Sequence, residues 1–271
     1  MKPEVRFSLI LGFIFILLFL FARLLAPTIK EGVETIALGS GYEKSESDKF
    51  WIYYHKNNYS AQSMMNLDTE LVAFTDDFRK HMDNQGVLIS DFDTCTIFLL
   101  QSHEKLLDFG MQMEVADMSN NGGYFSPSTT SIAVIGADIE VLKHEIVHLL
   151  LHMSSNTINK PLPPWIDEGF AQYFEKYPNN HVLNAVEYMP SIEDIVAFGR
   201  ADFSKPDNPI YYKSSLYLLT FLNDNVKTNW ILYKTLKGEL ESANSSIISD
   251  LDKVGLRKLN YEFKTWYKNL K

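Results

Sequence analysis

Histidine and carboxylate residues gather in one otherwise apolar segment, Lys143–Glu175. His144 and His148 are four residues apart, which places both imidazoles on one face of a helix, one turn apart. Two imidazoles so placed can bind one zinc ion, and Glu145, about 100° further around the helix, can reach a metal-bound water. The alternative interpretation is two core histidines that hydrogen-bond to carbonyl groups. His152 continues the row, either as a contact to the site or as a histidine at a helix end.

A catalytic zinc ion needs three protein ligands and one open position. Glu168 follows His148 after 19 intervening residues, beyond a loop rich in proline that lets the chain turn back. Its carboxylate is the expected third ligand, and Gly169 beside it allows the backbone to come close to the metal. A surface helix can also carry Asp167 and Glu168 for solubility alone. The complete zinc-ligand helix upstream favours the metal site.

Two helices must hold these residues. Asp138 is placed to cap a helix that carries both histidines, and Pro164 suits the first turn of the helix that carries Glu168. Upstream the pattern mixes strands and helices, expected over residues 50–55 (strand), 60–82 (helix), 94–100 (strand), 102–111 (helix) and 122–136 (two strand pieces with a turn at Pro127). After residue 190 the pattern is helical, with helices expected over residues 191–199, 211–225, 227–238, 244–254 and 257–269. This order predicts an α+β fold.

The pentapeptide HEIVH followed by WIDEGFAQYFE resembles the gluzincin metallopeptidases, specifically the peptidase-MA-like group and more distantly the zinc aminopeptidases. The motif W-x-x-E-G-x-A-x-Y is filled completely, by Trp165, Glu168, Gly169, Ala171 and Tyr173. The resemblance implies a zincin-like domain, a small β-sheet plus active-site helices, followed by an all-helical part. It implies one Zn²⁺ per chain, held by His144, His148 and Glu168, with Glu145 as general base.

Two further segments share the resemblance. GGYFSPSTTSIAVIG, residues 122–136, is similar to the family's edge strand, along which a peptide substrate pairs by strand addition. YYKSSLYLLTFL is similar to the helix that brings a tyrosine to the developing oxyanion. Tyr212 fits that role best by its spacing to Ser215, and Tyr211 is the alternative.

The sequence departs from the family in two places. The aminopeptidases carry a glutamate that binds a free N-terminus, whereas GGYFSPS here contains no acid, so cleavage within a peptide chain is expected. Relatives also place an aspartate four residues after the third ligand to orient a histidine, and Gln172 stands there instead. Another group or a carbonyl must then hold that histidine. The competing function is a non-catalytic zinc- and peptide-binding sensor or assembly domain, which would not need Glu145.

The chain is expected to start with a transmembrane anchor, residues 1–26, and an extracytoplasmic linker, residues 27–49. The peptidase domain would follow over residues 50–271, with a zinc-binding α+β half at 50–177 and a helical half at 178–271. The cell membrane is the expected location, with the domain outside the cytoplasm. A cleaved signal peptide and a secreted protein are the alternative.

Composition excludes several classes of partner and site. The formal charge of −9 argues against nucleic acid, and an acidic domain is not expected to adhere to an anionic membrane by its own surface. Cys95 is the single cysteine, which excludes an intrachain disulfide and a cysteine-rich metal cluster. The oligomeric state is left open.

Overall fold

The computed structural model divides the chain into two compact units, residues 1–42 and 43–271, and the elements discussed below lie in the second, apart from the first residue of the first strand. The structure describes residues 38, 40–112, 122–155, 161–179, 183, 188–203, 209–225, 227–242 and 253–270. The predicted anchor lies outside them. Within these residues, no helix has both the length and the apolar character needed to cross a bilayer.

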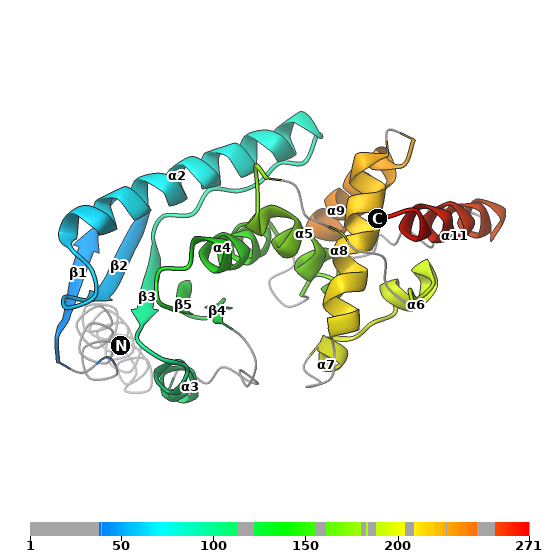
Figure 1. Ribbon diagram of the computed structural model, residues 1–271. Coiled ribbons are helices and arrows are strands. Elements are labelled where there is room, and N and C mark those ends of the chain that lie inside the picture. The colour runs from blue at the N-terminus through cyan, green and yellow to red at the C-terminus, as the bar shows by residue number, and fades with distance from the viewer. Residues whose placement is uncertain are drawn as a thin grey trace, which may run out of the picture. The chain divides into compact units, whose positions relative to one another are not determined.

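A five-stranded sheet with strand order β1-β2-β3-β5-β4 forms the first half of the fold. The strands are β1 (Tyr42–Glu46), β2 (Phe50–His55), β3 (Cys95–Leu100), β4 (Gly123–Ser126) and β5 (Ser131–Ile135). β2, β3 and β5 run parallel, whereas β4 pairs antiparallel with β5 and forms one edge (Figure 1). β1 lies within residues 27–49, which were expected to be a linker, and was not predicted.

Helices cover both faces of this sheet. Phe50, Ile52 and Tyr54 of β2 are buried while the residues between them are half-buried, the alternation expected of a strand with one core face. The core face packs against α2 (Ala61–Asn84), whose first turn is closed by a capping box at Ser60. α3 (His103–Gln112) lies on the opposite face, where the Phe98 and Phe109 ring centroids are 4.5 Å apart (Figure 1).

In the rest of the described residues the regular elements are helices alone, so the fold is α+β as predicted. They are α4 (Ile139–Ser154), α5 (Pro164–Glu175), α6 (Ile192–Val196), α7 (Arg200–Phe203), α8 (Pro209–Asp224), α9 (Asn229–Ser242) and α11 (Lys253–Lys268). α7 was not predicted. Most of the helix expected at 244–254 lies outside the described residues.

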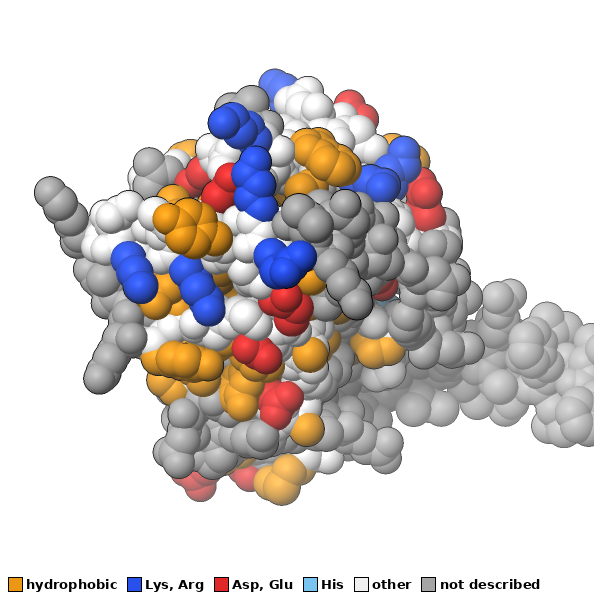
Figure 2. Space-filling model, turned by 90° about the vertical axis from the view of Figure 1, so that its right-hand side faces the viewer, with side chains coloured by type: hydrophobic (Ala, Val, Ile, Leu, Met, Phe, Trp, Pro, Cys, Tyr) orange, Lys and Arg blue, Asp and Glu red, His pale blue; other side chains and the backbone are white. Residues whose placement is uncertain are grey.

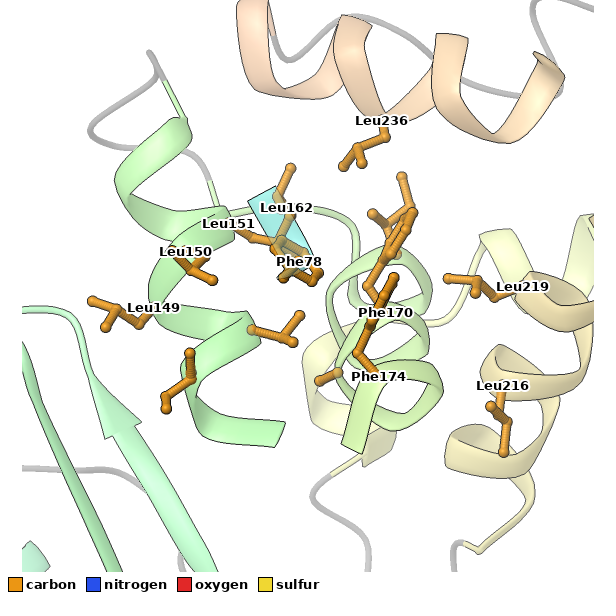
Figure 3. Close-up of a cluster of buried hydrophobic side chains, with 14 of the residues drawn as sticks. Phe78, Leu149, Leu150, Leu151, Leu162, Phe170, Phe174, Leu216, Leu219 and Leu236 are labelled. Carbon is orange, nitrogen blue, oxygen red and sulfur yellow. The ribbon is translucent and has the colours of Figure 1, made fainter. Parts of the chain in front are cut away.

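Apolar contacts hold α5 between α4 and α8. Trp165 and Phe170 are fully buried, as expected of the residues that pack the helix pair, and the Phe170 and Phe174 rings stack with centroids 6.3 Å apart. Figure 3 shows the surrounding side chains, which come from five elements and the loop before α5: Phe78, Leu149, Leu150, Leu151, Leu162, Phe170, Phe174, Leu216, Leu219 and Leu236. This packing fixes α5 against α4, and so fixes Glu168 relative to the two histidines.

A chain of polar side chains also ties α5 to its neighbours. Tyr173 accepts a hydrogen bond from Asn223 of α8 at 2.7 Å, and Asn223 accepts one from Tyr233 of α9 at 2.6 Å. His81 of α2 lies 2.8 Å from the Tyr233 hydroxyl. Because that hydroxyl donates to Asn223, neutral His81 donates from Nε2 to Tyr233. Four helices are therefore connected through hydrogen bonds behind the site.

His81 should make folding stability depend on pH. Burial lowers the pKa of His81, so the folded state favours the neutral ring more than the unfolded chain does. The contribution of neutral His81 to the free energy of unfolding is complete above the ordinary imidazole pKa of about 6.5. It is lost as the pH falls through that value toward the lowered pKa of the folded state. We expect His81→Gln, which keeps a donor, to lose less stability than the natural chain between pH 7.5 and pH 5.5. Urea unfolding midpoints test this, and equal losses would contradict it.

Candidate metal centre

His144, His148 and Glu168 converge, as the sequence analysis predicts. The Nε2 atoms of the two histidines are 3.2 Å apart, and Glu168 Oε2 lies 3.6 Å from the first and 3.8 Å from the second. All three ligand atoms lie within 4.8 Å of one another, so the group can hold a metal ion. A tetrahedral ion with bonds of about 2.0–2.2 Å separates its ligand atoms by about 3.3–3.6 Å, close to these distances.

Local sequence explains how each ligand reaches the site. Asp138 caps α4, accepting hydrogen bonds from the backbone N–H groups of Glu140 at 3.0 Å and Val141 at 3.3 Å. The helix then presents His144 and His148 on one face. Pro164 is the first residue of α5, where it needs no N–H partner, and Glu168 follows one turn later.

Two carboxylates on α5 hold the outer nitrogens of the histidines. His148 Nδ1 lies 2.8 Å from Asp167 Oδ1, and His144 Nδ1 lies 3.2 Å from Glu175 Oε2. A carboxylate only accepts, so each Nδ1 carries the proton and each Nε2 lone pair faces its neighbour. Two lone pairs 3.2 Å apart beside a carboxylate oxygen repel unless a proton or a cation lies between them. The donor set therefore fits a cation.

Neither Asp167 nor Glu175 was predicted to belong to the site. Asp167 had solubility as its alternative role, and the aspartate absent at Gln172 left the group that orients a histidine unidentified. The structure supplies Glu175, seven residues after Glu168 and therefore on the same face of α5. Gln172 does not substitute, since the Nδ1 atoms of His144 and His148 already lie against Glu175 and Asp167.

Electrostatics in this group favour bound cations. Burial lowers the pKa of His144, but hydrogen bonds with Glu168 and Glu175 outweigh it and raise the pKa to about 10. For His148, burial also opposes the change, and the charges of Asp167 and Glu168 raise the pKa. In the metal-free site these histidines therefore hold protons tightly, and a metal ion must displace them.

Glu145 occupies a more buried position than the ligands. Glu145 is buried, whereas His144, His148 and Glu168 are each half-buried. Burial raises the pKa of Glu145, while the neighbouring His144 and His148 act in the opposite direction. A buried carboxylate with a raised pKa next to a cation site can accept and return a proton.

The tyrosine predicted to stabilise the oxyanion lies on α8. A Cβ added to Gly169 would lie 3.2 Å from the Ser215 carbonyl oxygen, so α8 passes directly beside the residue after Glu168. Tyr211 and Tyr212 are one turn earlier on α8, and both rings contact Phe203. The choice between the two tyrosines stays a prediction.

His152 lies at the opposite end of the histidine row, where its ring meets Phe125 of β4 with centroids 5.7 Å apart. Burial lowers the pKa of His152, which favours its neutral form. This contact places the end of α4 against the edge strand. A substrate lying along β4 would therefore pass His152.

Removing either supporting carboxylate should weaken metal binding. We expect Asp167→Asn and Glu175→Gln each to reduce zinc affinity by about 10–100-fold, because each histidine loses a charged acceptor that fixes its ring. Competition with a chromophoric chelator measures this affinity. Gln172→Ala is the matched control on the same helix, since the Gln172 amide nitrogen has no partner. An equal loss in that control would contradict a specific role for the two carboxylates.

No family model matches this chain, and no similar curated protein was found. The resemblance to gluzincins therefore rests on the motif residues themselves. Within the described part of the chain, His144, His148 and Glu168 form the one group of this kind that can hold a metal ion.

Proposed function

We propose that this chain is a zinc-dependent metallopeptidase with a zincin-like fold that cleaves peptide bonds within a chain. The observation that carries the proposal is the convergence of His144, His148 and Glu168 next to the buried carboxylate of Glu145. A metal site that served only structure would not need this carboxylate. Structural zinc sites usually have four protein ligands, often cysteines, and Cys95 is the single cysteine of the chain.

The donor set favours zinc. Two imidazole nitrogens and one carboxylate oxygen match the three-ligand sets of catalytic zinc, which keep the fourth position for water or substrate. Magnesium and calcium prefer sites made of oxygen ligands alone. The support for zinc is therefore the chemistry of His144, His148 and Glu168, together with the carboxylates of Asp167 and Glu175 behind the histidines.

Proton transfer falls to Glu145. Zinc, when bound, acts as a Lewis acid and makes water a stronger acid at neutral pH. Glu145 takes a proton from the attacking water and gives it to the leaving amine. The Tyr212 hydroxyl, or that of Tyr211, donates a hydrogen bond to the oxyanion that develops on the peptide carbonyl. Asp167 and Glu175 keep the histidine rings oriented throughout.

The edge strand supports a peptide substrate. Ile135 N–H donates to the Gly122 carbonyl at 2.9 Å, which places Gly122, Tyr124 and Ser126 among the residues that bond to β5. The backbone groups of Gly123 and Phe125 then point away from β5, toward the outer side of this edge strand. Gly123 is buried and Phe125 is half-buried, so an extended peptide can pair by strand addition at Phe125. No acid lies in GGYFSPS to bind a free N-terminus, which favours cleavage within a chain.

The proposed function also includes a location in the cell. We place the peptidase outside the cytoplasm, attached to the cell membrane through residues 1–26, on the apolar character of residues 7–22 and the preceding Lys2 and Arg6. Labelling of an introduced exposed cysteine in intact cells, with an impermeant maleimide, tests the orientation. Labelling only after lysis would overturn it.

Peptide release tests the activity. The full-length protein, purified in detergent, is incubated with reduced, denatured casein, and products are mapped by mass spectrometry. We expect internal cleavages that disappear with a chelator and return with zinc. A protein that binds one zinc ion per chain but cleaves neither casein nor a random peptide library would be the non-catalytic sensor or assembly domain instead.

A further inference from the structure

Positive charge is concentrated on two C-terminal helices of this acidic chain. The chain carries a formal charge of −9, yet α9 with the turn before it and α11 each display three exposed lysines. These six residues, called the basic surface below, are Lys227, Lys234, Lys237, Lys258, Lys264 and Lys268. Because charges separated by more than about 8–10 Å are screened in physiological salt, acids elsewhere do not cancel this local field.

Few carboxylates accompany the basic surface. Within the described residues of α9 and α11, Glu241 and Glu262 are at least partly exposed, and Glu239 is 5% exposed and faces the core. Glu241 lies 3.9 Å from Lys237, and Glu262 lies 4.0 Å from Lys258. Each of these carboxylates offsets one positive charge, and the six exposed lysines still outnumber the two carboxylates that are at least partly exposed on these helices. The two helices therefore present a net positive face.

Exposed aromatic rings lie among the lysines. Trp230 is 54% exposed and sits between Lys227 and Lys234, one turn away on either side. Tyr261 is 73% exposed and lies three residues from both Lys258 and Lys264. Tryptophan and tyrosine flanked by lysine are the side chains that favour the boundary between lipid and water.

Both helices belong to the same end of the domain, because each packs on α8. Figure 2 views this end from the side of α11, where Lys and Arg side chains lie mainly over the upper half of the face, interspersed with hydrophobic groups and with some Asp and Glu side chains. The cations and the aromatic rings therefore form a mixed surface rather than a purely charged one.

We propose that the basic surface binds the headgroup region of an anionic lipid bilayer, with Trp230 and Tyr261 entering the interface. Six of the seven exposed cations on α9, the turn before it and α11 are lysines, and the seventh is Arg257 of α11. Lysines act as mobile, hydrated point charges and suit a fluid layer of anionic headgroups. Proteins that bind the carboxylates of an acidic protein partner more often use arginine, which holds a carboxylate in fixed bidentate geometry. The net charge of −9 led to the expectation that the domain does not adhere to an anionic membrane by its own surface, and the local concentration of lysines reverses that expectation. The proposal does not depend on the metal site.

A single fluorescent label can test this contact in the full-length chain. Cys95 is fully buried, so a cysteine introduced by Thr265→Cys, on the exposed side of α11, can be labelled selectively with an environment-sensitive dye. The labelled protein is reconstituted with phosphatidylcholine vesicles that contain either no anionic lipid or 30% phosphatidylglycerol. A matched label at Met65→Cys on α2 reports a distant exposed site, since Met65 is 59% exposed.

We expect the dye at residue 265, but not at residue 65, to shift to the blue and to be quenched by brominated lipid, only in the anionic vesicles. Lys→Glu changes at Lys234, Lys264 and Lys268 should reduce the bound fraction by about tenfold or more. The same changes at Lys56, Lys80 and Lys105, exposed lysines on other elements, alter net charge equally and should have little effect.

Three outcomes would overturn the proposal. They are an equal response in neutral vesicles, no response in anionic vesicles, and an equal loss in both triple variants. A response to soluble polyglutamate without one to anionic vesicles would also overturn it, in favour of an acidic protein partner.

Discussion

Replacing Glu145 with Gln should lower peptide hydrolysis by about 10²–10⁴-fold while leaving one metal ion bound per chain. The amide keeps the shape of the side chain but cannot take a proton from water or return one to the leaving amine. Glu145 is not among the three convergent ligands, His144, His148 and Glu168, so zinc affinity should stay close to that of the natural protein. Initial rates on a mapped cleavage site, together with elemental analysis of the same preparation, separate the two properties.

Glu140→Gln is the matched control for this substitution. Glu140 lies in the first turn of the same helix, but it is exposed and its carboxylate lies 3.9 Å from Lys176. We expect a change of less than about twofold in rate, because exposed pairs of this kind contribute little. If Glu145→Gln kept its rate, proton transfer by Glu145 would be wrong. If it lost both rate and metal, the carboxylate would act in metal binding instead.

The metal ligands were predictable because their spacing is local. His144 and His148 share a helix, and helical periodicity alone brings them together. Glu168 required one further inference, that the second helix turns back on the first, and the apolar residues around it favoured that packing. The structure confirms the convergence of all three. Zinc as the metal and peptide hydrolysis as the reaction are proposals built on that convergence.

Glu175 was missed for a physical reason. Its role depends on how α4 and α5 are aligned, which spacing within one helix does not give. α4 and α5 run in opposite directions. His144 therefore lies beside Glu175 at the end of α5, and His148, one turn later in α4, lies beside Asp167 near the start of α5. With that alignment known, a carboxylate seven residues after Glu168 becomes the natural substitute for the aspartate absent at Gln172.

The first strand was missed because its sequence is polar. The stretch YEKSE in β1 has no apolar alternation, and charged residues are typical of short strands at the edge of a sheet. Its Lys44 instead extends over the Trp51 ring of β2, with Nζ 3.6 Å from the ring centroid. Local periodicity within one segment does not predict a contact between two strands. Residues 27–49 were therefore expected to be a linker throughout.

Replacing Glu168 with Ala should remove most metal binding from the purified protein. The site would keep two imidazoles, so we expect affinity to fall by more than the roughly 10–100-fold that loss of an outer hydrogen-bond partner costs. Binding to the folded state alone also stabilises it, by about 2.7 kcal/mol at a free metal concentration of 100 times Kd. Zinc should therefore raise the Tm of the natural chain and not that of the variant.

The metal-free variant should stay folded. Glu168 is 16% exposed at its side chain, so its removal does not open the apolar core around Phe170, and Glu175 and Asp167 stay beside His144 and His148. Circular dichroism of both metal-free proteins provides that control. Should Glu168→Ala bind zinc as tightly as the natural chain, Glu168 would not be the third ligand. Asp167, the other acid at the start of α5, would then be the residue to replace next, because its carboxylate already reaches His148.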